Sequence, residues 1–286
     1  MTIKIVTDST CDLPPVVVKE LGITVIPLYI NIGDQGFLDG VEISRKEFYS
    51  NLAAYPNHPT TGTPGVLSFI NTFDELVDHG ATEIITIHIS EQLSATINVA
   101  RAAAEDYQRV PVTVVDSGQL SIGTGFQVEL AAELAQQGKS RDEILQAISD
   151  LRERTFVTAG LNTLEFLKRS GRMNRFMTGI GSLLNIKPVL TMFNGQPGSD
   201  KVRTSRRAEK HLISLLEDRV PIERFALLHT NAHQKAEEFK DKIRQYLPQG
   251  EIFSMDITPV IGAHLGPGAV GYAIVSKIFA SGKTSF

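Results

Sequence analysis

The sequence predicts an α/β protein with two closely packed domains. The first is a mostly parallel sheet with helices on both faces, and the second is a smaller mixed α/β domain. Two observations predict this class. In the first half of the chain, short β-branched runs alternate with segments of helical periodicity, the pattern of parallel strands joined by crossover helices. The second half contains both kinds of segment without this regular alternation.

Four runs in the first half are typical of buried strands, because they are rich in Val, Ile and Thr. They cover residues 3–9, 26–32, 83–89 and 112–117. The segments between them carry apolar residues three and four positions apart, as an amphipathic helix requires. These expected helices cover residues 14–22, 44–55, 66–80, 94–107 and 126–138.

A further helix over residues 140–155 leads into the second half. Ser140 is a good N-cap, and Glu143 three residues later completes a capping box. We place the domain boundary near residue 157, which gives an N-terminal domain over 1–157 and a C-terminal domain over 158–286. No Pro/Ser-rich hinge separates them, so we expect the domains to pack closely, with a ligand site in the cleft between them.

The second half predicts strands and helices in a less regular order. Strands are expected at 156–161, 187–195, 224–231 and 251–266. Residues 268–279 form either a strand or a strand passing into a helix. Helices are expected at 163–173, 206–219 and 234–247.

Composition excludes several classes of protein. The formal net charge is −4, which favours neither nucleic acid nor a membrane surface as the main partner. No run reaches the ~18 apolar residues of a membrane span, and the first residues lack the pattern of a secretory signal. The single cysteine, Cys11, excludes an intramolecular disulfide. We therefore expect a cytoplasmic protein without stable membrane insertion.

Three polar segments stand where strands are expected to end or helices to begin. In DSTCDLP, residues 8–14, the side chains are most simply a strand end and a helix cap; no histidine or carboxylate cluster supports a metal there. TTGTPG holds Thr61, and SEQLSATINVA holds Ser94 at a helix start. Hydroxyls at helix starts either cap the helix or hold an anion, and two of them after neighbouring parallel strands would face one crevice.

IGAHLGPGAVG, residues 261–271, places His264 at the expected end of an apolar strand, among glycines. A lone histidine is more often structural than catalytic, but this one has few polar neighbours in the sequence, which favours contact with a ligand. Two basic segments, 167–175 with Arg172 and 201–210 with Arg203, indicate an anionic ligand or a docking partner, although most such residues are solvated helix faces.

Two other functions use the same residues. An acyl hydrolase could employ Ser94 and His264, although the sequence has no GxSxG nucleophile elbow. A binder of sugar or nucleotide phosphates could use the same crevice, although GxGxxG is absent and ASGKTS at the C-terminus lacks the first glycine of a P-loop.

The ordered series of motifs resembles the DegV family over essentially the whole chain. The motifs are VTDSTCDLP, TTGTPG, SEQLSATINVA, VVDS, LEFLKRSGRM, LNIKPVL and IGAHLGPGAVG. The resemblance implies a two-domain α/β architecture that binds one long-chain fatty acid and has no cofactor. It also implies, as a partner, a separate ATP-binding fatty acid kinase subunit that converts the presented carboxylate to an acyl phosphate.

Carried onto this chain, the family's carboxylate-binding residues are Thr61, Ser94 and His264, and the arginine of its Gly-Arg motif is Arg172. The family's Thr-Ser-Gln-Pro-Ser is TTGTPG here, and its Ser-Gly-Thr-Tyr-Gln is SATIN, so the hydroxyls remain while their surroundings change. The expected protein is non-catalytic, with no metal and no catalytic residues. Its apolar tunnel would be lined partly by residues 177–190 and by strand residues near Ile261, with Arg172 and, second, Arg203 facing the partner or its phosphates.

Overall fold

The computed structural model describes residues 2–177, 186–250 and 252–278. This part of the chain forms two compact units. The first contains residues up to Arg152 together with Thr258–Ile261, and the second contains Glu153–Ile257 and the residues from Gly262 onward. Each unit is built around a sheet of its own.

The main sheet of the first unit is parallel throughout, as predicted. Its order is β2-β1-β6-β7, and its strands are β1 (Ile3–Asp8), β2 (Thr24–Ile26), β6 (Glu83–His88) and β7 (Val112–Asp116). All six residues of β6 are buried, because a central parallel strand is covered on both faces. Its sequence, EIITIH, accordingly carries three isoleucines and lacks a strict alternation of apolar and polar residues.

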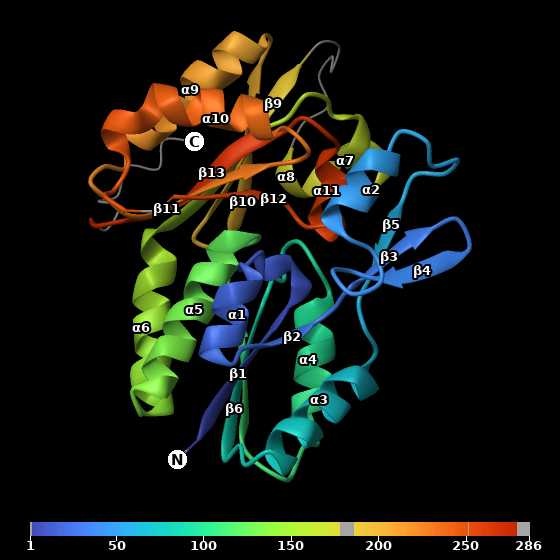
Figure 1. Ribbon diagram of the computed structural model, residues 1–286, viewed down its shortest axis with the longest axis vertical. Coiled ribbons are helices and arrows are strands. Elements are labelled where there is room, and N and C mark those ends of the chain that lie inside the picture. Colours follow the sequence, from blue (N-terminus) through green and yellow to red (C-terminus); the bar gives the residue numbers. More distant parts are fainter. Residues whose placement is uncertain (1, 178–185, 251, 279–286) are drawn as a thin grey trace. The chain divides into compact units, whose positions relative to one another are not determined.

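Helices cover both faces of this sheet, again as predicted (Figure 1). On one side lie α3 (Val66–Asp78) and α4 (Thr96–Glu105), and on the other α1 (Pro15–Leu21) and α5 (Ile122–Gln136). Phe69 and Phe73 of α3 are fully buried against the sheet. The remaining helices of the first half are η1 (Ser9–Cys11), α2 (Arg45–Asn51) and α6 (Arg141–Arg154). The capping box of α6 is confirmed, because the amide of Ser140 donates to Glu143 across 2.9 Å.

The expected strand over residues 26–32 is interrupted near its start. β2 ends at Ile26, and a new strand, β3 (Tyr29–Ile32), begins three residues later. The interruption falls at Pro27, which lacks the N–H that a continuous ladder needs. β3 joins β4 (Gln35–Leu38) and β5 (Thr60–Gly62) in a separate antiparallel sheet of order β4-β3-β5. The segment around Thr61 is therefore a short strand rather than a helix start.

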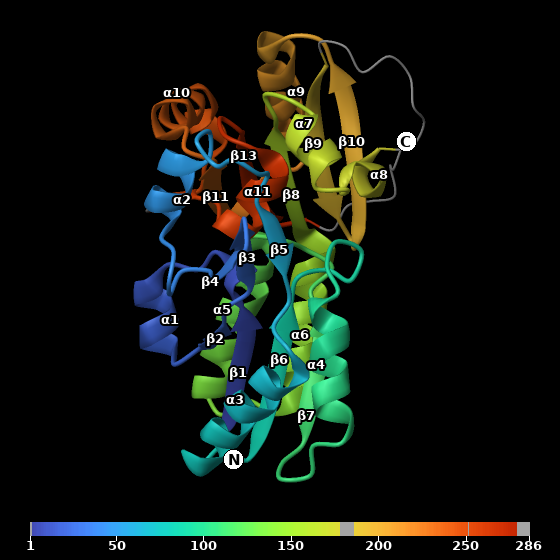
Figure 2. The same cartoon turned by 90° about the vertical axis from the view of Figure 1, so that its right-hand side faces the viewer.

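The second unit holds a six-stranded mixed sheet of order β10-β9-β8-β13-β11-β12. Its strands are β8 (Thr155–Gly160), β9 (Lys187–Phe193), β10 (Gln196–Val202), β11 (Ile222–His229), β12 (Phe253–Asp256) and β13 (Val270–Ser276). Only the pair β11–β12 is parallel. Figure 2 shows β9 and β10 as a hairpin. No strand was expected over β10, whose Pro197 and Gly198 are tolerated at a sheet edge.

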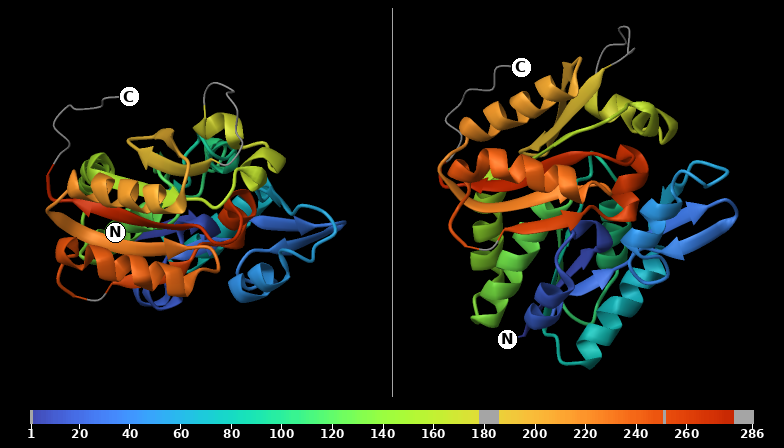
Figure 3. Two further views of the ribbon diagram at one scale, coloured as in Figure 1. Left: turned by 90° about the horizontal axis from the view of Figure 1, so that it is seen from above. Right: turned by 45° about the horizontal axis from the view of Figure 1, so that its top comes forward.

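Two helices, α9 (Ser205–Glu217) and α10 (His233–Ile243), lie on the same face of this sheet (Figure 3). Beneath them Tyr272 stacks between Phe225 and Phe239, with ring centroids 5.7 and 6.2 Å apart. The described residues of this unit also form three short helices, α7 (Glu165–Arg169), α8 (Met173–Phe176) and η2 (Arg244–Tyr246). Among the described residues, no helix has both the length and the apolarity needed to cross a membrane.

The expected strand over residues 251–266 is wrong beyond Asp256. After β12 the chain forms helix α11 (Pro259–Leu265), and Pro259 suits the first helical position because its missing N–H would have no partner there. A short apolar run cannot be assigned to strand or helix by periodicity alone. The single helix expected over 163–173 is wrong only beyond Arg169, where α7 ends and Gly171, at φ 71°, separates it from α8.

Candidate functional site

Ser94 lies at the carboxyl edge of the parallel sheet, in the turn between β6 and α4. Its hydroxyl lies 2.9 Å from that of Thr96 and accepts the Thr96 amide at 3.3 Å. The side chain is half-buried and stands just before the first turn of α4, whose N-cap is Ala95 and where free amides favour an anion. This placement agrees with the helix start expected from the sequence.

Thr61 belongs to the same unit but to another sheet. It stands in β5, where it pairs with Ile30 of β3, and it is half-buried. The N-cap of the following helix, α3, is Gly65. The expectation of two helix starts after neighbouring strands of one parallel sheet is therefore wrong for Thr61, which presents its hydroxyl from an antiparallel strand.

His264 is carried by helix α11 and is half-buried, so its expected position at a strand end is wrong. The tight turn after it is confirmed, because Gly266 and Gly268 have φ values of 73° and 84°. A Cβ on Gly266 would lie 2.3 Å from Phe166, and one on Gly268 would lie 2.0 Å from Asn162. Only glycine satisfies both the left-handed backbone and the close approach.

Two buried aspartates hold the segment that begins α11, and sequence reasoning missed this role. The amide of Thr258 donates to Asp12 across 2.9 Å, and the hydroxyl of Thr258 donates to Asp39. Ser9 donates a further bond to Asp39 at 2.6 Å. Thr258–Ile261 belongs to the first unit, as do Asp12 and Asp39. These two buried carboxylates therefore fix the start of α11, the helix that also carries His264.

The two carboxylates differ in their partners. Asp12 accepts from Arg45 at 2.9 Å and from Ser121 at 2.5 Å, in addition to Thr258. Asp39 is bonded to hydroxyls, and burial raises its pKa to about 6, aided by the negative charge of Asp12 and opposed by these hydroxyls and by Arg45. The charge of Arg45 thus stabilises the Asp12 carboxylate. The Asp39 side chain, in contrast, gains or loses its proton near pH 6.

The first aspartate of DSTCDLP has the structural role favoured by the sequence. Asp8 caps η1 by accepting the Thr10 amide at 3.0 Å. It also lies 2.9 Å from Nδ1 of His88, and both side chains are fully buried. Burial raises the pKa of Asp8, but bonds to His88 and Thr10 outweigh it and hold that pKa below its usual range. Cys11 is buried, and burial raises its pKa to about 12, which disfavours a thiolate nucleophile.

The basic residues selected from the sequence have different environments. Arg172 follows Gly171, and its guanidinium donates to the carbonyl of Ser170 at 3.3 Å. Burial, together with the charge of Arg175, lowers the pKa of Arg172, so an anion beside it would be favoured. Arg203 is exposed in the turn between β10 and α9.

The expected tunnel-lining segment falls partly outside the described residues. Within it, residues 178–185 are not described by the structure, while Met177 and Val189 are buried. Ile261, expected on a strand, is buried in α11. Over residues 2–177, 186–250 and 252–278, no group of three His, Cys, Asp or Glu side chains could hold a metal ion.

The fold defines a class of two-unit α/β proteins, with a parallel sheet in one unit and a mixed sheet in the other. The sequence model of one family, described as "Uncharacterised protein, DegV family", matches residues 2–277. The chain belongs to the DegV family. DegV domain-containing proteins of Halalkalibacterium halodurans and Deinococcus radiodurans are 33% and 34% identical to it, over 94% and 96% of this chain and 96% and 98% of theirs.

Solved structures of the same family have the same fold. A DegV family protein from Thermus thermophilus, described by its fatty acid binding, is 32% identical, with a TM-score of 0.87, over 96% of this chain and 100% of the other. DegV from Bacillus subtilis, described as a fatty acid binding protein, is 28% identical, with a TM-score of 0.88, over 97% of this chain and 100% of the other.

Proposed function

We propose that this protein binds one long-chain fatty acid in an apolar tunnel, with the carboxylate held by Thr61, Ser94 and His264. The observation that carries the proposal is the agreement, along nearly the whole chain, with two solved proteins described as fatty acid binding. Residues 177–190 would contribute to the tunnel, and the protein would act in the cytoplasm without a catalytic centre of its own.

The chemistry of the three residues suits a carboxylate. A buried carboxylate needs hydrogen-bond donors, because its desolvation is otherwise prohibitive. Hydroxyls from β5 and from the start of α4, with an imidazole from α11, supply such donors. Hydrogen bonds to a charged acceptor are worth about 1.5–3 kcal/mol each. These groups would fix the head group and its orientation.

The alkyl chain supplies most of the affinity. Each buried methylene contributes about 0.8 kcal/mol, so a tail of about fourteen methylenes contributes roughly 11 kcal/mol before the cost of ordering it. A ligand held in this way survives purification, whereas a sugar or nucleotide phosphate would be lost on dialysis.

We further propose that the bound carboxylate is presented to a separate ATP-binding kinase that forms the acyl phosphate. Arg172 is the residue that would face the partner or its phosphates. Its guanidinium is partly buried beside a second arginine, and a planar guanidinium contacts phosphate oxygens in pairs. Arg203, in an exposed turn, is the second candidate.

Mass spectrometry of lipid extracted from the purified protein tests the binding. We expect one fatty acid per chain, with an intact carboxylate. A protein that contains no fatty acid, and that binds none after delipidation and titration with palmitate or oleate, would overturn the proposal. Turnover of an activated acyl ester that disappears in Ser94→Ala would instead establish the hydrolase.

A further inference from the structure

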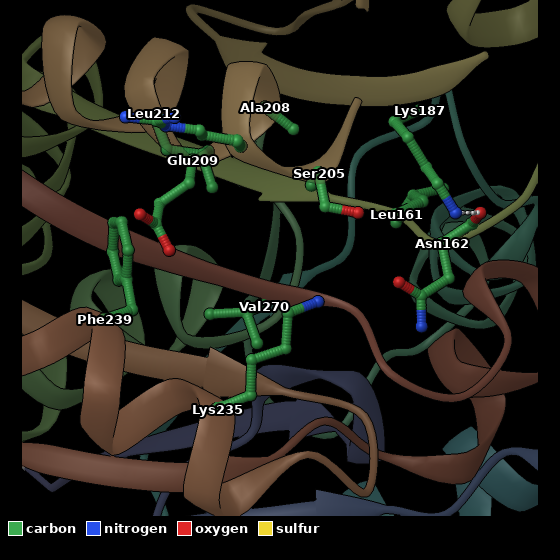
Figure 4. A pocket seen from close by; sticks show the side chains of 12 residues that line it. Leu161, Asn162, Lys187, Ser205, Ala208, Glu209, Leu212, Lys235, Phe239 and Val270 are labelled. Carbon is green, nitrogen blue, oxygen red and sulfur yellow. Dashed lines mark hydrogen bonds between the residues drawn. The ribbon is translucent and has the colours of Figure 1, made fainter. Parts of the chain in front are cut away.

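A pocket of about 270 Å³ lies within the second unit, between α9 and α10 and above β8, β9 and β13. Figure 4 shows its lining side chains. Among the described residues that line it, none belongs to the proposed carboxylate site. The pocket therefore needs an explanation of its own.

The charge of the pocket is positive. Lys187, Arg206 and Lys235 contribute three cations, and Glu209 contributes one carboxylate. That carboxylate also lies 2.7 Å from Nζ of Lys242, so it offsets the three cations only in part. A net excess of cations in a concave, partly desolvated site favours an anionic ligand.

Two of the cations belong to different elements but act on one another. Lys187 is at the start of β9, and Lys235 is in the first turn of α10. Burial, and then the charge of Lys187, lower the pKa of Lys235. Each ammonium has one carbonyl acceptor, Asn162 for Lys187 at 2.6 Å and Gly268 for Lys235 at 3.1 Å. An ammonium has three donors, so both retain capacity for an anion.

Apolar side chains line the other side of the pocket, where Figure 4 also places the Glu209 carboxylate. Leu212 of α9 and Phe239 of α10 line it, and they are 4% and 3% exposed. In Figure 4 both lie on the side away from Lys187 and Asn162. The volume is below the ~300–1,000 Å³ of drug-sized sites, so a ligand that uses both walls must be small.

We propose that this pocket binds a small organic anion, consisting of a carboxylate or phosphate head group on a short apolar or aromatic body. The head group would lie between Lys187 and Lys235, and the body would lie against Leu212 and Phe239. This ligand is separate from the long-chain fatty acid, and the proposal does not depend on the function proposed above.

Isothermal titration calorimetry on the full chain tests the ligand class. We expect phenyl phosphate, benzoate or both to bind, and to bind at least tenfold more tightly than inorganic phosphate or benzyl alcohol. Stronger binding of phenyl phosphate identifies a phosphate ester site, and stronger binding of benzoate a carboxylate site. If neither phenyl phosphate nor benzoate binds more tightly than both inorganic phosphate and benzyl alcohol, the proposal is overturned.

Variants then locate the binding. Lys235→Gln should weaken the tighter aromatic probe about tenfold or more, because it removes a charge-assisted contact. Glu209→Gln should tighten the same probe, because it removes the pocket's carboxylate. Lys240→Gln is the matched control, since Lys240 is on the same helix but pairs with Glu237 and does not line this pocket.

The opposite pattern would overturn the assignment. Equal binding by the wild type, Lys235→Gln and Glu209→Gln would place the probe elsewhere. A probe that is lost in Ser94→Ala but retained in Lys235→Gln would belong to the fatty acid head-group site. Urea denaturation of each variant, compared with that of the wild type, checks that the variants remain folded.

Discussion

The amide of Thr258 donates a hydrogen bond to the carboxylate of Asp12 across 2.9 Å, although the two residues are separated by 246 positions in the chain. Both are buried. Thr258 immediately precedes α11, the helix that carries His264. Because Asp39 accepts the hydroxyl of the same threonine, the start of this helix is fixed by two carboxylates with different electrostatic surroundings.

Asp39 should make stability depend on pH in a defined window. Burial raises its pKa from 3.8 to about 6 in the folded protein, so the folded chain binds this proton more tightly than the unfolded chain. The contribution of Asp39 to the free energy of unfolding is therefore fully present below about pH 4 and is lost as the pH rises through about 6. The loss is about 3 kcal/mol.

Asp39→Asn removes this titration. Urea denaturation at several pH values between 4 and 7 measures the free energy of unfolding of the variant and of the wild type. We expect the difference, variant minus wild type, to increase by up to about 3 kcal/mol as the pH rises from 4 to 7. Asp34→Asn, which removes a carboxylate at an exposed position, is the matched control for the substitution itself. A constant difference for Asp39→Asn would contradict the assignment.

The hydroxyls of Thr61 and Ser94 should contribute separately to fatty acid affinity. In the proposed site, Thr61→Ala or Ser94→Ala would remove one hydrogen bond to a charged acceptor, and we then expect the Kd for palmitate to rise about tenfold or more. Displacement of a fluorescent fatty acid from delipidated protein measures the change.

Thr60→Ala is the matched control for the strand. Thr60 precedes Thr61 in β5, and successive side chains of a strand point to opposite faces. The affinity of the Thr60→Ala variant for palmitate should remain within about twofold of wild type. Equal losses in the Thr60 and Thr61 variants would show a general effect on β5 instead of a contact with the carboxylate.

The parallel sheet was predictable because its strands carry their signal locally. β6 is buried on both faces, and its β-branched residues, three Ile and one Thr, indicate a strand. The segment over 251–266 was not predictable, because an apolar run of that length fits either a strand or a helix. The hairpin of β9 and β10 did have a signal, Asn194-Gly195, whose φ values of 45° and 76° suit a tight hairpin turn.

The candidate site divides in the same way. Ser94 and His264 stand in motifs that resemble those of a family, so they could be proposed before the fold was known. Asp39 could not, because its partners Ser9 and Thr258 lie 30 and 219 positions away. The raised pKa of Asp39 comes from burial. The sequence around a single polar residue indicates neither its burial nor its partners from distant segments.

Gly266 should tolerate a side chain less well than a glycine with the same backbone in open space. Gly266 and Gly138 have φ values of 73° and 74°, but only Gly266 has a neighbour, Phe166, within 4 Å of a built Cβ. Gly138→Ala should cost about 1–2 kcal/mol of strain, and Gly266→Ala a further 1–3 kcal/mol of overpacking. Equal losses of stability in urea denaturation would show that the Phe166 ring moves aside at no cost.

Arg172 should separate binding of the fatty acid from its phosphorylation. Its guanidinium is held by the Ser170 carbonyl at 3.3 Å, and the charge of Arg175 and burial both disfavour its charged form. A phosphate group beside it would offset both effects. If the proposed kinase partner is supplied, we expect Arg172→Ala to leave the Kd for palmitate within about twofold of wild type and to reduce acyl phosphate formation about tenfold or more.

The measurement is the rate of acyl phosphate formation at limiting concentration of this protein, together with palmitate affinity of the same preparation. Arg203→Ala is the comparison, because Arg203 is exposed and exposed charges contribute little; we expect a smaller effect on the rate. An Arg172→Ala protein that is phosphorylated at the wild-type rate removes this arginine from the transfer step. An Arg172→Ala protein that no longer binds palmitate places it in the fatty acid pocket instead.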